Sequence, residues 1–560
     1  MILTGAEIVV ETLIEQGTDV VFGYPGGQVI DLYDALYTRS DRIHHVLTAH
    51  EQGASHAADG YARISGKVGV VIATSGPGAT NLVTGIATAY LDSIPMVAIT
   101  GNVPNSLIGR DSFQEVDITG ITLPVTKHNF FVKSVDQLAD TIREAFAIAK
   151  SGRPGPVLVD VPKDVQKAAF AFAAQEPAAK MPQRIAKDDK LQKAAEMIAA
   201  SEKPYIYIGG GVITAGVSEE IIRLADTIDA PIGCTMMGLS AVPDENPRFL
   251  GMEGMHGHYA SSVGQDEADL IITIGARFSD RATGNVAKYA RRAKILHIDA
   301  DGAELNKNVT AHMSIECDIQ DALHRLLAIV KEQQHPEWMA RIAVLRAEEQ
   351  KQFEDITPVE KLTPYALIHE VSKHTTPETP VATDVGQHQM WTAQYYPFRK
   401  PRTFASSGGL GTMGYGLGAA IGAAYASGKK TVLFTGDGSF GMNLNELATL
   451  SANNIPVVII LMNNGVLGMV RQWQTLFFDR HYSNTMLTDR KTDFVKLAAA
   501  FGIAGYRISE YSELESVMEK AFAEDGPVLV ECMIDKDEFV LPMLPPGGCI
   551  EDIIVKVEGE

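Results

Sequence analysis

The amino-acid sequence predicts an α/β protein made of several doubly wound domains with parallel sheets. Short apolar runs of strand length alternate with longer helical stretches along most of the chain. Many of these runs end in a polar turn that contains glycine, which is typical of the carboxyl ends of parallel strands. The chain has 560 residues, too many for one hydrophobic core, so we expect about two to four domains.

The predicted order of units follows from this alternation and from two interruptions of it. In the first unit, strands are expected to begin near Val20, His45, Val68, Pro95 and Pro156. Later stretches that lack the alternation are interpreted as linkers, the first rich in Ala and Gln and the second in charge. The predicted organisation is an α/β domain at 1–165, a linker at 166–190, a central α/β domain at 191–335, a linker at 336–360, a third α/β domain at 361–540 and a C-terminal tail at 541–560. The tail is expected to be irregular and to cover a site.

Composition and charge exclude some classes of function. The net charge of −21 argues against nucleic acid or an anionic membrane as a partner. No uninterrupted apolar run is long enough to span a bilayer, and no signal peptide is visible. The four cysteines have neither metal-ligand nor disulfide spacing, so we expect a reducing, cytoplasmic location.

The most informative motif lies in the third unit, where two apolar runs each end in a polar turn. The first run ends in Gly436-Asp437-Gly438 and the second in Asn463-Asn464. Asp437 and Asn464 offer the hard oxygen ligands that Mg²⁺ prefers. Gly436 and Gly438 allow backbone N–H groups close to a phosphate, and a helix expected to begin near Ser439 would point its positive end there.

These residues predict a site for Mg²⁺ and a diphosphate. On the motif alone, an ordinary turn with a capping Asp stays an alternative. The spacing of the motif resembles the fingerprint of thiamine diphosphate (ThDP) enzymes. ThDP chemistry needs a carboxylate that hydrogen-bonds the pyrimidine ring of the cofactor. Glu51 is the candidate, because it follows the strand at His45 and opens a helix rich in small residues, expected from Gln52 to Tyr61. The alternative for Glu51 is an acidic residue that complements the helix dipole.

Several further segments, together with this motif, resemble the catalytic subunits of the acetohydroxyacid synthase family over essentially the whole chain. The segments are Phe22-Gly-Tyr-Pro-Gly-Gly, Glu51-Gln-Gly-Ala, Thr74-Ser-Gly-Pro-Gly-Ala-Thr-Asn, Phe113-Gln-Glu, Gly386-Gln-His-Gln-Met-Trp and Ser407-Gly-Gly-Leu-Gly. The resemblance implies the three-domain fold of the pyruvate-oxidase type, with a pyrimidine-binding, an FAD-binding and a diphosphate-binding domain. It also implies an active site between two subunits, so we expect a homodimer as the minimum active unit, or a homotetramer.

The resemblance assigns roles to individual positions. Asp437 and Asn464 would hold Mg²⁺ together with the backbone carbonyl of Val466, and Gln387 and His388 would contact the diphosphate. The Gly411 carbonyl would accept a hydrogen bond from the pyrimidine amino group, and Met413 would separate the two cofactor rings. The remaining ThDP positions are Glu51, Pro25, Gly436, Gly438, Ser439, Gly465 and Leu467. For Met413, generic core packing is the alternative.

Specificity for the substrate is expected from two other residues. Enzymes of this family decarboxylate pyruvate and join the remaining two-carbon unit to a second 2-oxoacid, the acceptor. The acceptor keeps its carboxylate in the product, and Arg281 matches the family arginine that pairs with this carboxylate. Trp473 matches the tryptophan that packs on the alkyl group of this acceptor, where one methylene is worth about 1–3 kcal/mol. The alternatives are an ion pair with Asp280 for Arg281 and a core or interface position for Trp473. The resemblance also places Phe113 and Met255 on the substrate channel. It assigns catalytic roles to Glu51, Gln114, Lys163 and Gly27.

The expectation of FAD comes from the resemblance and from a glycine-rich turn after an apolar strand, which alone is weak evidence. The reaction changes no net oxidation state, so FAD would be structural. The FAD positions that the resemblance implies are Arg153, Gly209, Gly210, Gly211, Thr235, Met255, His256, Gly257, Gly275, Arg277, Asp280, Arg281, Asp299 and Asp318.

One residue departs from the family pattern. Gln28 stands where many members carry Ala, directly after Gly26-Gly27. Because this position is expected near the mouth of the channel, we expect reduced sensitivity to sulfonylurea-type inhibitors.

The sequence therefore predicts a ThDP-, Mg²⁺- and FAD-dependent enzyme of branched-chain amino-acid biosynthesis. It would decarboxylate pyruvate and join the product to pyruvate or 2-oxobutyrate, and a separate small subunit is expected to regulate it. The alternatives are an FAD-free catabolic acetolactate synthase, which Trp473 and the Arg277-Phe-Ser-Asp-Arg segment disfavour, and a pyruvate oxidase. Intact Glu51, Asp437 and Asn464 disfavour a catalytically inactive paralogue.

Overall fold

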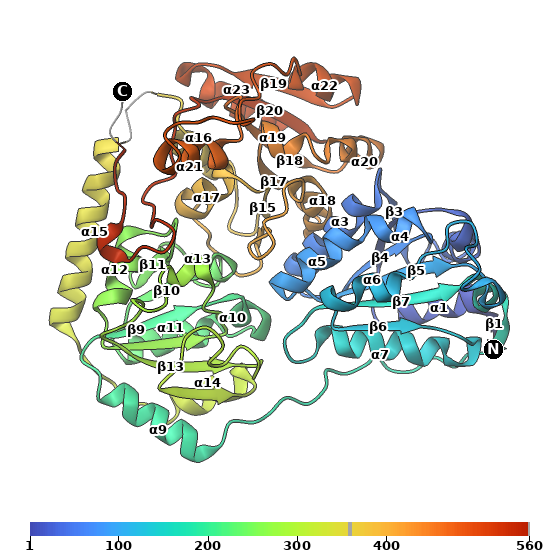
Figure 1. Cartoon of the computed structure of the whole chain (residues 1–560), viewed down its shortest axis with the longest axis horizontal. Helices are drawn as coiled ribbons and strands as arrows, with labels where there is room; N and C mark the ends of the chain where they lie inside the picture. The colour runs from blue at the N-terminus through green and yellow to red at the C-terminus, as the bar shows by residue number, and fades with distance from the viewer. Residues whose placement is uncertain (357–360, 558–560) are drawn as a thin grey trace.

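The computed structural model describes residues 1–356 and 361–557. Three six-stranded sheets organise the chain, each parallel throughout and each in its own domain (Figure 1). Helices cover both faces of each sheet, which is why the strands are nearly continuous apolar runs. In the third domain, Val432, Leu433 and Phe434 on one strand are all fully buried. This arrangement confirms the predicted α/β class with doubly wound parallel sheets.

The N-terminal domain contains the first sheet, with strand order β3-β2-β4-β5-β7-β6. Its strands are β2 (Val20–Tyr24), β3 (His44–Leu47), β4 (Gly69–Ala73), β5 (Met96–Asn102), β6 (His128–Phe131) and β7 (Pro156–Pro162). Its helices are α1 (Gly5–Glu15), α2 (Ile30–Tyr37), α3 (Glu51–Ser65), α4 (Pro77–Asn81), α5 (Val83–Asp92), α6 (Ile118–Thr122), α7 (Leu138–Lys150) and α8 (Lys163–Lys167). A short strand β1 (Ile2–Thr4) precedes α1 and pairs antiparallel with β8 (Ala169–Ala171).

The central domain has the strand order β11-β10-β9-β12-β13-β14, the order of a dinucleotide-binding sheet. Its strands are β9 (Pro204–Ile208), β10 (Ile232–Cys234), β11 (Phe249–Met252), β12 (Leu270–Ile274), β13 (Lys294–Asp299) and β14 (Met313–Glu316). Its helices are α9 (Asp188–Ala199), α10 (Gly210–Ala215), α11 (Ser218–Thr227), α12 (Tyr259–Glu267), α13 (Asp280–Thr283) and α14 (Ile319–Leu327).

Most of the segment 336–360, which was expected to be a second linker, is helical. It forms the long helix α15 (Pro336–Ile356), while residues 357–360 lie outside the described residues. Trp338, Ile342 and Leu345 recur at helical spacing and are buried against the central domain, with Trp338 Nε1 donating to Pro204 O at 3.0 Å. The many charges of this stretch mask the apolar stripe when the sequence is judged by composition, although two of them, Arg346 and Glu349, also contact the central domain.

The third domain repeats the topology of the first. Its strand order is β16-β15-β17-β18-β20-β19. When the strands of each sheet are counted along the chain, both sheets have the order second, first, third, fourth, sixth, fifth. Its strands are β15 (Val381–Thr383), β16 (Phe404–Ala405), β17 (Thr431–Gly436), β18 (Val457–Asn463), β19 (Ala504–Ile508) and β20 (Val528–Met533). Its helices are α16 (Pro364–Lys373), α17 (Gln387–Tyr395), α18 (Gly416–Ser427), α19 (Asp437–Phe440), α20 (Leu447–Asn453), α21 (Gly468–Phe477), α22 (Phe494–Ala500) and α23 (Leu514–Ala523).

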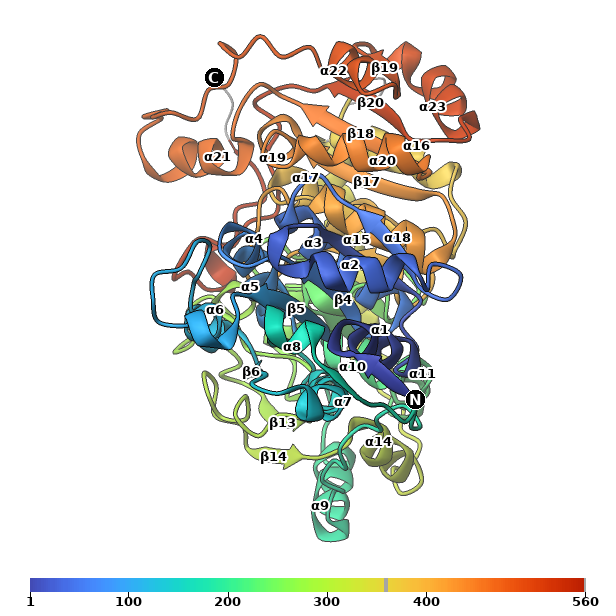
Figure 2. The same ribbon diagram turned by 90° about the vertical axis from the view of Figure 1, so that its right-hand side faces the viewer.

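The N-terminal and third domains meet through α3 and α18, which lie side by side in both ribbon views (Figures 1 and 2). Glycines on α18 bring the two backbones close. A Cβ at Gly422 would lie 1.9 Å from the Ala57 carbonyl oxygen, and one at Gly418 would lie 2.7 Å from the His56 Cβ. From the other side, a Cβ at Gly60 of α3 would lie 2.2 Å from the Ala419 carbonyl oxygen, so small residues on both helices serve the domain contact.

Among the described residues, no helix combines the length and apolar character that crossing a bilayer requires. The four cysteines are free; three are buried and Cys549 is half-buried. The tail beyond 540 is largely irregular, with one isolated bridge between Met543 and Ile554, and residues 558–560 of the predicted tail lie outside the described residues.

Candidate functional site at the carboxyl edges of three sheets

Glycine-rich turns mark the central sheet at the point where its strand order reverses, between β9 and β12. Gly209–Gly211 follow β9, and Gly275 follows β12. A Cβ at Gly209 would lie 2.4 Å from the Gly275 carbonyl oxygen, and one at Gly211 would lie 2.6 Å from the Gly275 Cα. Only glycine allows the two turns to pack this closely. In open α/β sheets this reversal point is where ligands bind.

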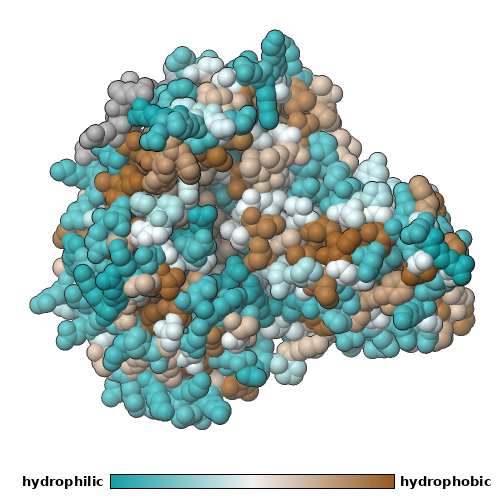
Figure 3. All heavy atoms as spheres, viewed as in Figure 1, coloured by the Kyte–Doolittle hydropathy of each residue, from teal (hydrophilic) through white to brown (hydrophobic). Residues whose placement is uncertain are grey.

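A cavity of about 1510 Å³ opens at this edge and is lined by all three domains. The face seen in Figure 3 is hollowed near its centre, between the N-terminal domain and the other two. Of the positions expected for FAD, all but Gly257 line the cavity. Those present are Arg153, Gly209, Gly210, Gly211, Thr235, Met255, His256, Gly275, Arg277, Asp280, Arg281, Asp299 and Asp318. Gly257 instead packs against the backbone of Glu253, whose carbonyl carbon would lie 2.5 Å from a Cβ at Gly257.

Charged groups of both signs line the cavity near the linker that follows the N-terminal domain. Arg153 Nε donates to Ser93 Oγ at 2.7 Å, and its Nη1 donates to Glu304 at 2.7 Å. Burial raises the pKa of the Asp299 carboxyl to about 6. This end of the cavity can therefore offer both donors and acceptors to a polar ligand.

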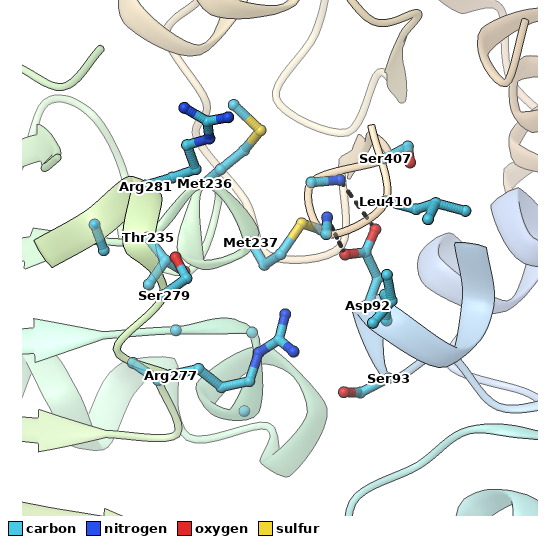
Figure 4. Close-up of a pocket in the computed structure, with 18 of the residues that line it drawn as sticks. Asp92, Ser93, Thr235, Met236, Met237, Arg277, Ser279, Arg281, Ser407 and Leu410 are labelled. Atoms are coloured by element: carbon cyan, nitrogen blue, oxygen red, sulfur yellow. Dashed lines mark hydrogen bonds between the residues drawn. The ribbon is translucent and has the colours of Figure 1, made fainter. Parts of the chain in front are cut away.

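Asp92, which was not among the predicted residues, fixes a loop on the opposite side of the cavity (Figure 4). Its carboxylate accepts hydrogen bonds from Gly408 N at 3.0 Å and Gly409 N at 2.7 Å, and pairs with Arg63 at 2.8 Å. The loop continues into Gly411 and Met413, which also line the cavity. The one sequence signal was an acidic residue in the last turn of a helix, where the helix dipole disfavours it.

The two residues expected to select the acceptor meet at this cavity. The guanidinium carbon of Arg281 lies 5.7 Å from the centre of the Trp473 ring, and Arg281 Nη1 contacts Met255 Sδ at 3.2 Å. The side chain of Arg281 is 61% exposed, and Asp280 lies 3.7 Å from it. A mostly exposed cation next to an aromatic ring can take up a ligand carboxylate and an alkyl group together.

The glycine–aspartate motif ends β17, beside the turn that follows β15. A Cβ at Gly436 would lie 2.9 Å from His388 Nδ1, and one at Gly438 would lie 2.7 Å from Leu467. His388 is buried, its Nε2 has no hydrogen-bond partner within the described residues, and burial lowers its pKa to about 3. Burial raises the pKa of Asp437 to about 6. A buried carboxylate and an unpartnered imidazole nitrogen fit a cation and a phosphate.

Asn464 and Gln387 lie together at the same edge. Asn464 Nδ2 donates to Gln387 Oε1 at 3.3 Å, which turns the amide oxygen of Asn464 away from Gln387. Val466 and Gly465 belong to the same turn, where Gly465 has a φ of +66° that favours glycine. Ser439 Oγ accepts from Gly414 N at 3.1 Å, and the role of Ser439 in ThDP binding stays a prediction. The helix expected near Ser439 begins at Asp437 and has only four residues.

Glu51 belongs to a separate cluster at the carboxyl edge of the N-terminal sheet. It is the first residue of α3, is 9% exposed, and accepts a hydrogen bond from Asn81 Nδ2 at 2.9 Å. A Cβ at Gly78 would lie 3.2 Å from its Oε1. Glu51 does not line the cavity that contains Gly411 and Met413. The residues expected to hold the diphosphate, among them His388, Asp437 and Asn464, do not line it either. Glu51 and these residues follow strands of two different sheets, which we call the two half-sites.

Lys163 follows β7, at the same carboxyl edge of the N-terminal sheet. It opens α8, its Nζ donates to the Gly27 carbonyl, and it lies 3.6 Å from Asp31. The sequence suggests no partner for this lysine, because Asp31 is distant along the chain.

The backbone oxygen of Gln28 accepts a hydrogen bond from Gln166, while the side-chain Oε1 of Gln28 is buried without a partner within the described residues. Gln28 does not line the cavity, and its effect on inhibitors stays a prediction.

Three further predicted residues lie apart from the cavity. Phe113 is 83% exposed, Pro25 is exposed, and Gln114 has a φ of +61° and packs against Gly76. Near the motif of the third domain, Met442 is another exposed apolar side chain, at 60%.

Among the described residues, no group of three or more His, Cys, Asp and Glu side chains is suited to a metal, so a cation at Asp437 would depend on other oxygen ligands.

Glu446 connects the two half-sites within one chain. Its buried carboxylate accepts from Ala49 N at 3.1 Å, His50 N at 3.0 Å and Thr449 Oγ1 at 2.6 Å. It therefore ties the start of α3, which carries Glu51, to the segment that follows Asp437. No local sequence signal indicates this contact, because Ala49 and Glu446 are 397 residues apart.

Comparison with protein families gives three matches that follow the three domains. Residues 3–121 match the thiamine pyrophosphate enzyme N-terminal TPP binding domain, 191–326 match the central domain, and 384–532 match the C-terminal TPP binding domain. Together the matches span more than half of the chain.

Comparison with individual proteins gives relatives over the full length. The chain is 45% identical to a probable acetolactate synthase large subunit of Methanocaldococcus jannaschii, covering 100% of this chain and 96% of that protein. It is 44% identical to the acetolactate synthase isozyme 1 large subunit of Escherichia coli, covering 98% and 97%. It is also 44% identical to an acetolactate synthase of Mycobacterium bovis, covering 98% and 91%.

Proposed function

Because the chain belongs to the acetolactate synthase large-subunit family of thiamine diphosphate enzymes, we propose that its two half-sites and its central cavity act together in one carboligation. Pyruvate loses CO₂, and its remaining two-carbon unit is added to a second 2-oxoacid. Pyruvate as acceptor gives 2-acetolactate, and 2-oxobutyrate gives 2-aceto-2-hydroxybutyrate. This reaction is the first common step in the biosynthesis of valine, leucine and isoleucine.

The diphosphate end of ThDP and its Mg²⁺ would be held at the carboxyl edge of the third sheet. Bound ThDP supplies the nucleophilic carbon and the electron sink for decarboxylation. Asp437 and the amide oxygen of Asn464 would bind Mg²⁺, with the Val466 carbonyl as a third protein ligand. The unpartnered Nε2 of buried His388 supports a phosphate oxygen beside it. Gln387 keeps the Asn464 amide oriented for the metal.

The acceptor would bind where Arg281 faces Trp473. This contact, at 5.7 Å, is the observation on which the proposal mainly rests. Arg281 would pair with the surviving carboxylate, and Trp473 would pack on the alkyl group. Gly27 and Lys163, joined by a hydrogen bond, would close the donor side of the pocket together with Phe113 and Gln114.

The large cavity is proposed to hold FAD. The glycine turns at the reversal point of the central sheet allow close approach of a dinucleotide, and the volume of about 1510 Å³ exceeds that of common small-ligand pockets. Arg153 and Arg277 would face the phosphates, and Asp299 and Asp318 would accept hydrogen bonds from hydroxyl groups. The flavin would hold the three domains around the acceptor site.

A second copy of the chain is proposed to complete each active site. Glu51, which would hydrogen-bond the pyrimidine ring, lies outside the cavity that Met413 lines in the same chain. The exposed apolar residues Phe113 and Met442, one beside each half-site, support an interface there. A homodimer would have two such sites, and a homotetramer would pair two dimers. The relatives named as large subunits support a separate small regulatory subunit, and a cytoplasmic location is proposed for the assembly.

A competition assay tests the function. Purified protein is supplied with ThDP, Mg²⁺ and equal concentrations of pyruvate and 2-oxobutyrate, with and without added FAD. Both acetohydroxy acids should form, with 2-aceto-2-hydroxybutyrate in excess, and the holoenzyme should show a flavin absorption spectrum. Oxygen uptake without carboligation would instead indicate a pyruvate oxidase, and full activity in protein without flavin would indicate the catabolic type.

A further inference from the structure

The segment after the last strand crosses from the third domain to the central domain, beside α12 (Figure 1). We call residues 536–544 the C-terminal strap. At its far end, Leu544 N donates to the Met255 carbonyl at 2.8 Å. Because Met255 contacts Arg281 through its sulfur, the strap touches one wall of the proposed acceptor site.

Glutamine side chains hold the strap along its length. Gln387 Nε2 donates to the Glu538 carbonyl at 2.9 Å, and Gln394 Nε2 donates to the Leu541 carbonyl at 3.2 Å. Between them, the Gln472 amide both donates to and accepts from the backbone of Val540. Gln472 Nε2 donates to Val540 O at 3.0 Å, and Val540 N donates to Gln472 Oε1 at 2.9 Å.

The pairing of Gln472 with Val540 requires an amide. The side chain is 1% exposed, so the two backbone groups that it satisfies have no access to water. A carboxylate at this position would have no donor for the Val540 carbonyl, and an apolar side chain would have neither donor nor acceptor. A buried backbone group left without a partner is costly, so the contact fixes both the strap and the helix that carries Gln472.

Gln472 also contacts the proposed metal side of the site. Gln387 Nε2 donates to Gln472 Oε1 at 3.0 Å, and Gln387 Oε1 accepts from Asn464 at 3.3 Å. A continuous chain of hydrogen bonds therefore runs from Asn464 through Gln387 and Gln472 to Val540.

The residue after Gln472 is Trp473, on the same ten-residue helix α21. Consecutive helical side chains point about 100° apart, so Gln472 faces the strap while Trp473 lines the cavity. Arg471, the residue before, pairs with Asp537 of the strap at 2.6 Å. The rotation of α21 about its axis, and with it the position of the Trp473 ring, is set by these contacts.

We propose that Gln472 is a positioning residue for acceptor selection, acting by holding Trp473 against the acceptor site through its paired hydrogen bonds to Val540. This inference rests on the proposed role of Trp473 in the acceptor pocket. Loss of the pairing lets α21 rotate and loosens the fit around the extra methylene of 2-oxobutyrate, while the donor half of the reaction is retained.

The test compares the product ratio of the holoenzyme variants in a mixture of pyruvate and 2-oxobutyrate. Gln472→Met keeps the length and volume of the side chain but removes both hydrogen bonds, and Gln472→Glu keeps the shape but removes the donor. In both, the ratio of 2-aceto-2-hydroxybutyrate to 2-acetolactate should fall by about 3–10-fold, a part of the selectivity that one methylene can provide. Gln192→Met, on the exposed face of α9, should leave the ratio unchanged.

A double variant separates positioning from a merely structural role. Trp473→Leu alone should lower the ratio, and adding Gln472→Met should change it by less than about twofold, because the two residues act through one contact. An unchanged ratio in folded Gln472→Met, shown by a cooperative melting transition and by CO₂ release from pyruvate, overturns the proposal. So does an undiminished effect of Gln472→Met in the Trp473→Leu background. If Trp473→Leu alone leaves the ratio unchanged, the proposed acceptor pocket itself is wrong.

Discussion

The guanidinium of Arg281 lies over the indole ring of Trp473, 5.7 Å from its centre, although the two residues come from different domains. The side chain of Arg281 is 61% exposed, and the carboxylate of its neighbour Asp280 stays 3.7 Å away, beyond hydrogen-bonding distance. This arrangement leaves the cation available to an acceptor that brings its own carboxylate.

Arg281→Gln should therefore impair the second half of the reaction more than the first. Loss of a charged hydrogen-bonding partner costs about 1.5–3 kcal/mol, so the yield of acetohydroxy acid per CO₂ released should fall by about 10–100-fold. The measurement is the ratio of carboligation product to CO₂. Lys193→Gln, a matched cation-to-amide change on the exposed face of α9, should leave that ratio within about twofold of the original. Equal losses in both steps would contradict the assignment of Arg281 to the acceptor.

Asp437 predicts a pH dependence of metal binding. Its pKa is raised to about 6 by burial, above the ordinary value of 3.8. Because Mg²⁺ binds the ionised carboxylate, apparent Mg²⁺ affinity should weaken by up to about tenfold for each pH unit below 6 and level off above it. Calorimetric titration of the ThDP-loaded protein with Mg²⁺ between pH 5 and 8 measures this. A pH-independent affinity across that range would remove Asp437 from the metal site.

The same shift has a consequence for the stability of the metal-free protein. A carboxyl whose pKa is higher in the folded state favours folding while it is protonated, and this stabilisation is lost as pH rises from about 4 to 6. Above pH 6, Asp437→Asn should therefore be more stable than the wild type without Mg²⁺, by up to about 3 kcal/mol. Added Mg²⁺ should raise the melting temperature of the wild type and not that of the variant. Thermal unfolding with chelator and with Mg²⁺ gives both comparisons.

Glu446 is expected to stabilise the junction of two domains. Glu446→Ala would leave the half-buried Ala49 N and His50 N without their acceptor, which should cost about 1–3 kcal/mol of unfolding free energy. Glu446→Gln keeps an acceptor oxygen and should cost less. Denaturant unfolding of the apo protein measures both. A loss no larger in Glu446→Ala than in the exposed control Glu519→Ala would show that the contact contributes nothing.

Much of the fold could be predicted because long, buried parallel strands have a strong apolar pattern and end in glycine turns. The segments after β9, β17 and β18 lie where this pattern predicts them, at the ligand-binding edges of sheets. Very short strands such as β16, with two residues, lack a recognisable period. Helix α15 was missed because its charges hide three buried apolar residues. Asp92, Glu446 and Gln472 were missed because each acts on a segment distant in sequence, which local patterns cannot indicate.

An active site shared between two chains, as proposed, predicts that two defective chains can restore activity together. Glu51→Gln should fold normally yet reduce acetolactate formation by about 10²–10⁴-fold, because the amide cannot take the carboxylate's part in proton transfer. Asp437→Asn should be similarly inactive through loss of the metal. Exposed Asp140→Asn serves as the control for an acid-to-amide change and should keep full activity.

Each heterodimer of these two chains would contain one doubly altered site and one intact site, if every site takes Glu51 from one chain and Asp437 from the other. With random pairing in co-expressed protein, about a quarter of the wild-type activity should return, since half of the dimers are mixed and each has one working site. Activity of the mixture, with each homodimer measured alone, is the readout. If both residues served a site within one chain, co-expression would restore nothing, and the inter-subunit site would have to be abandoned.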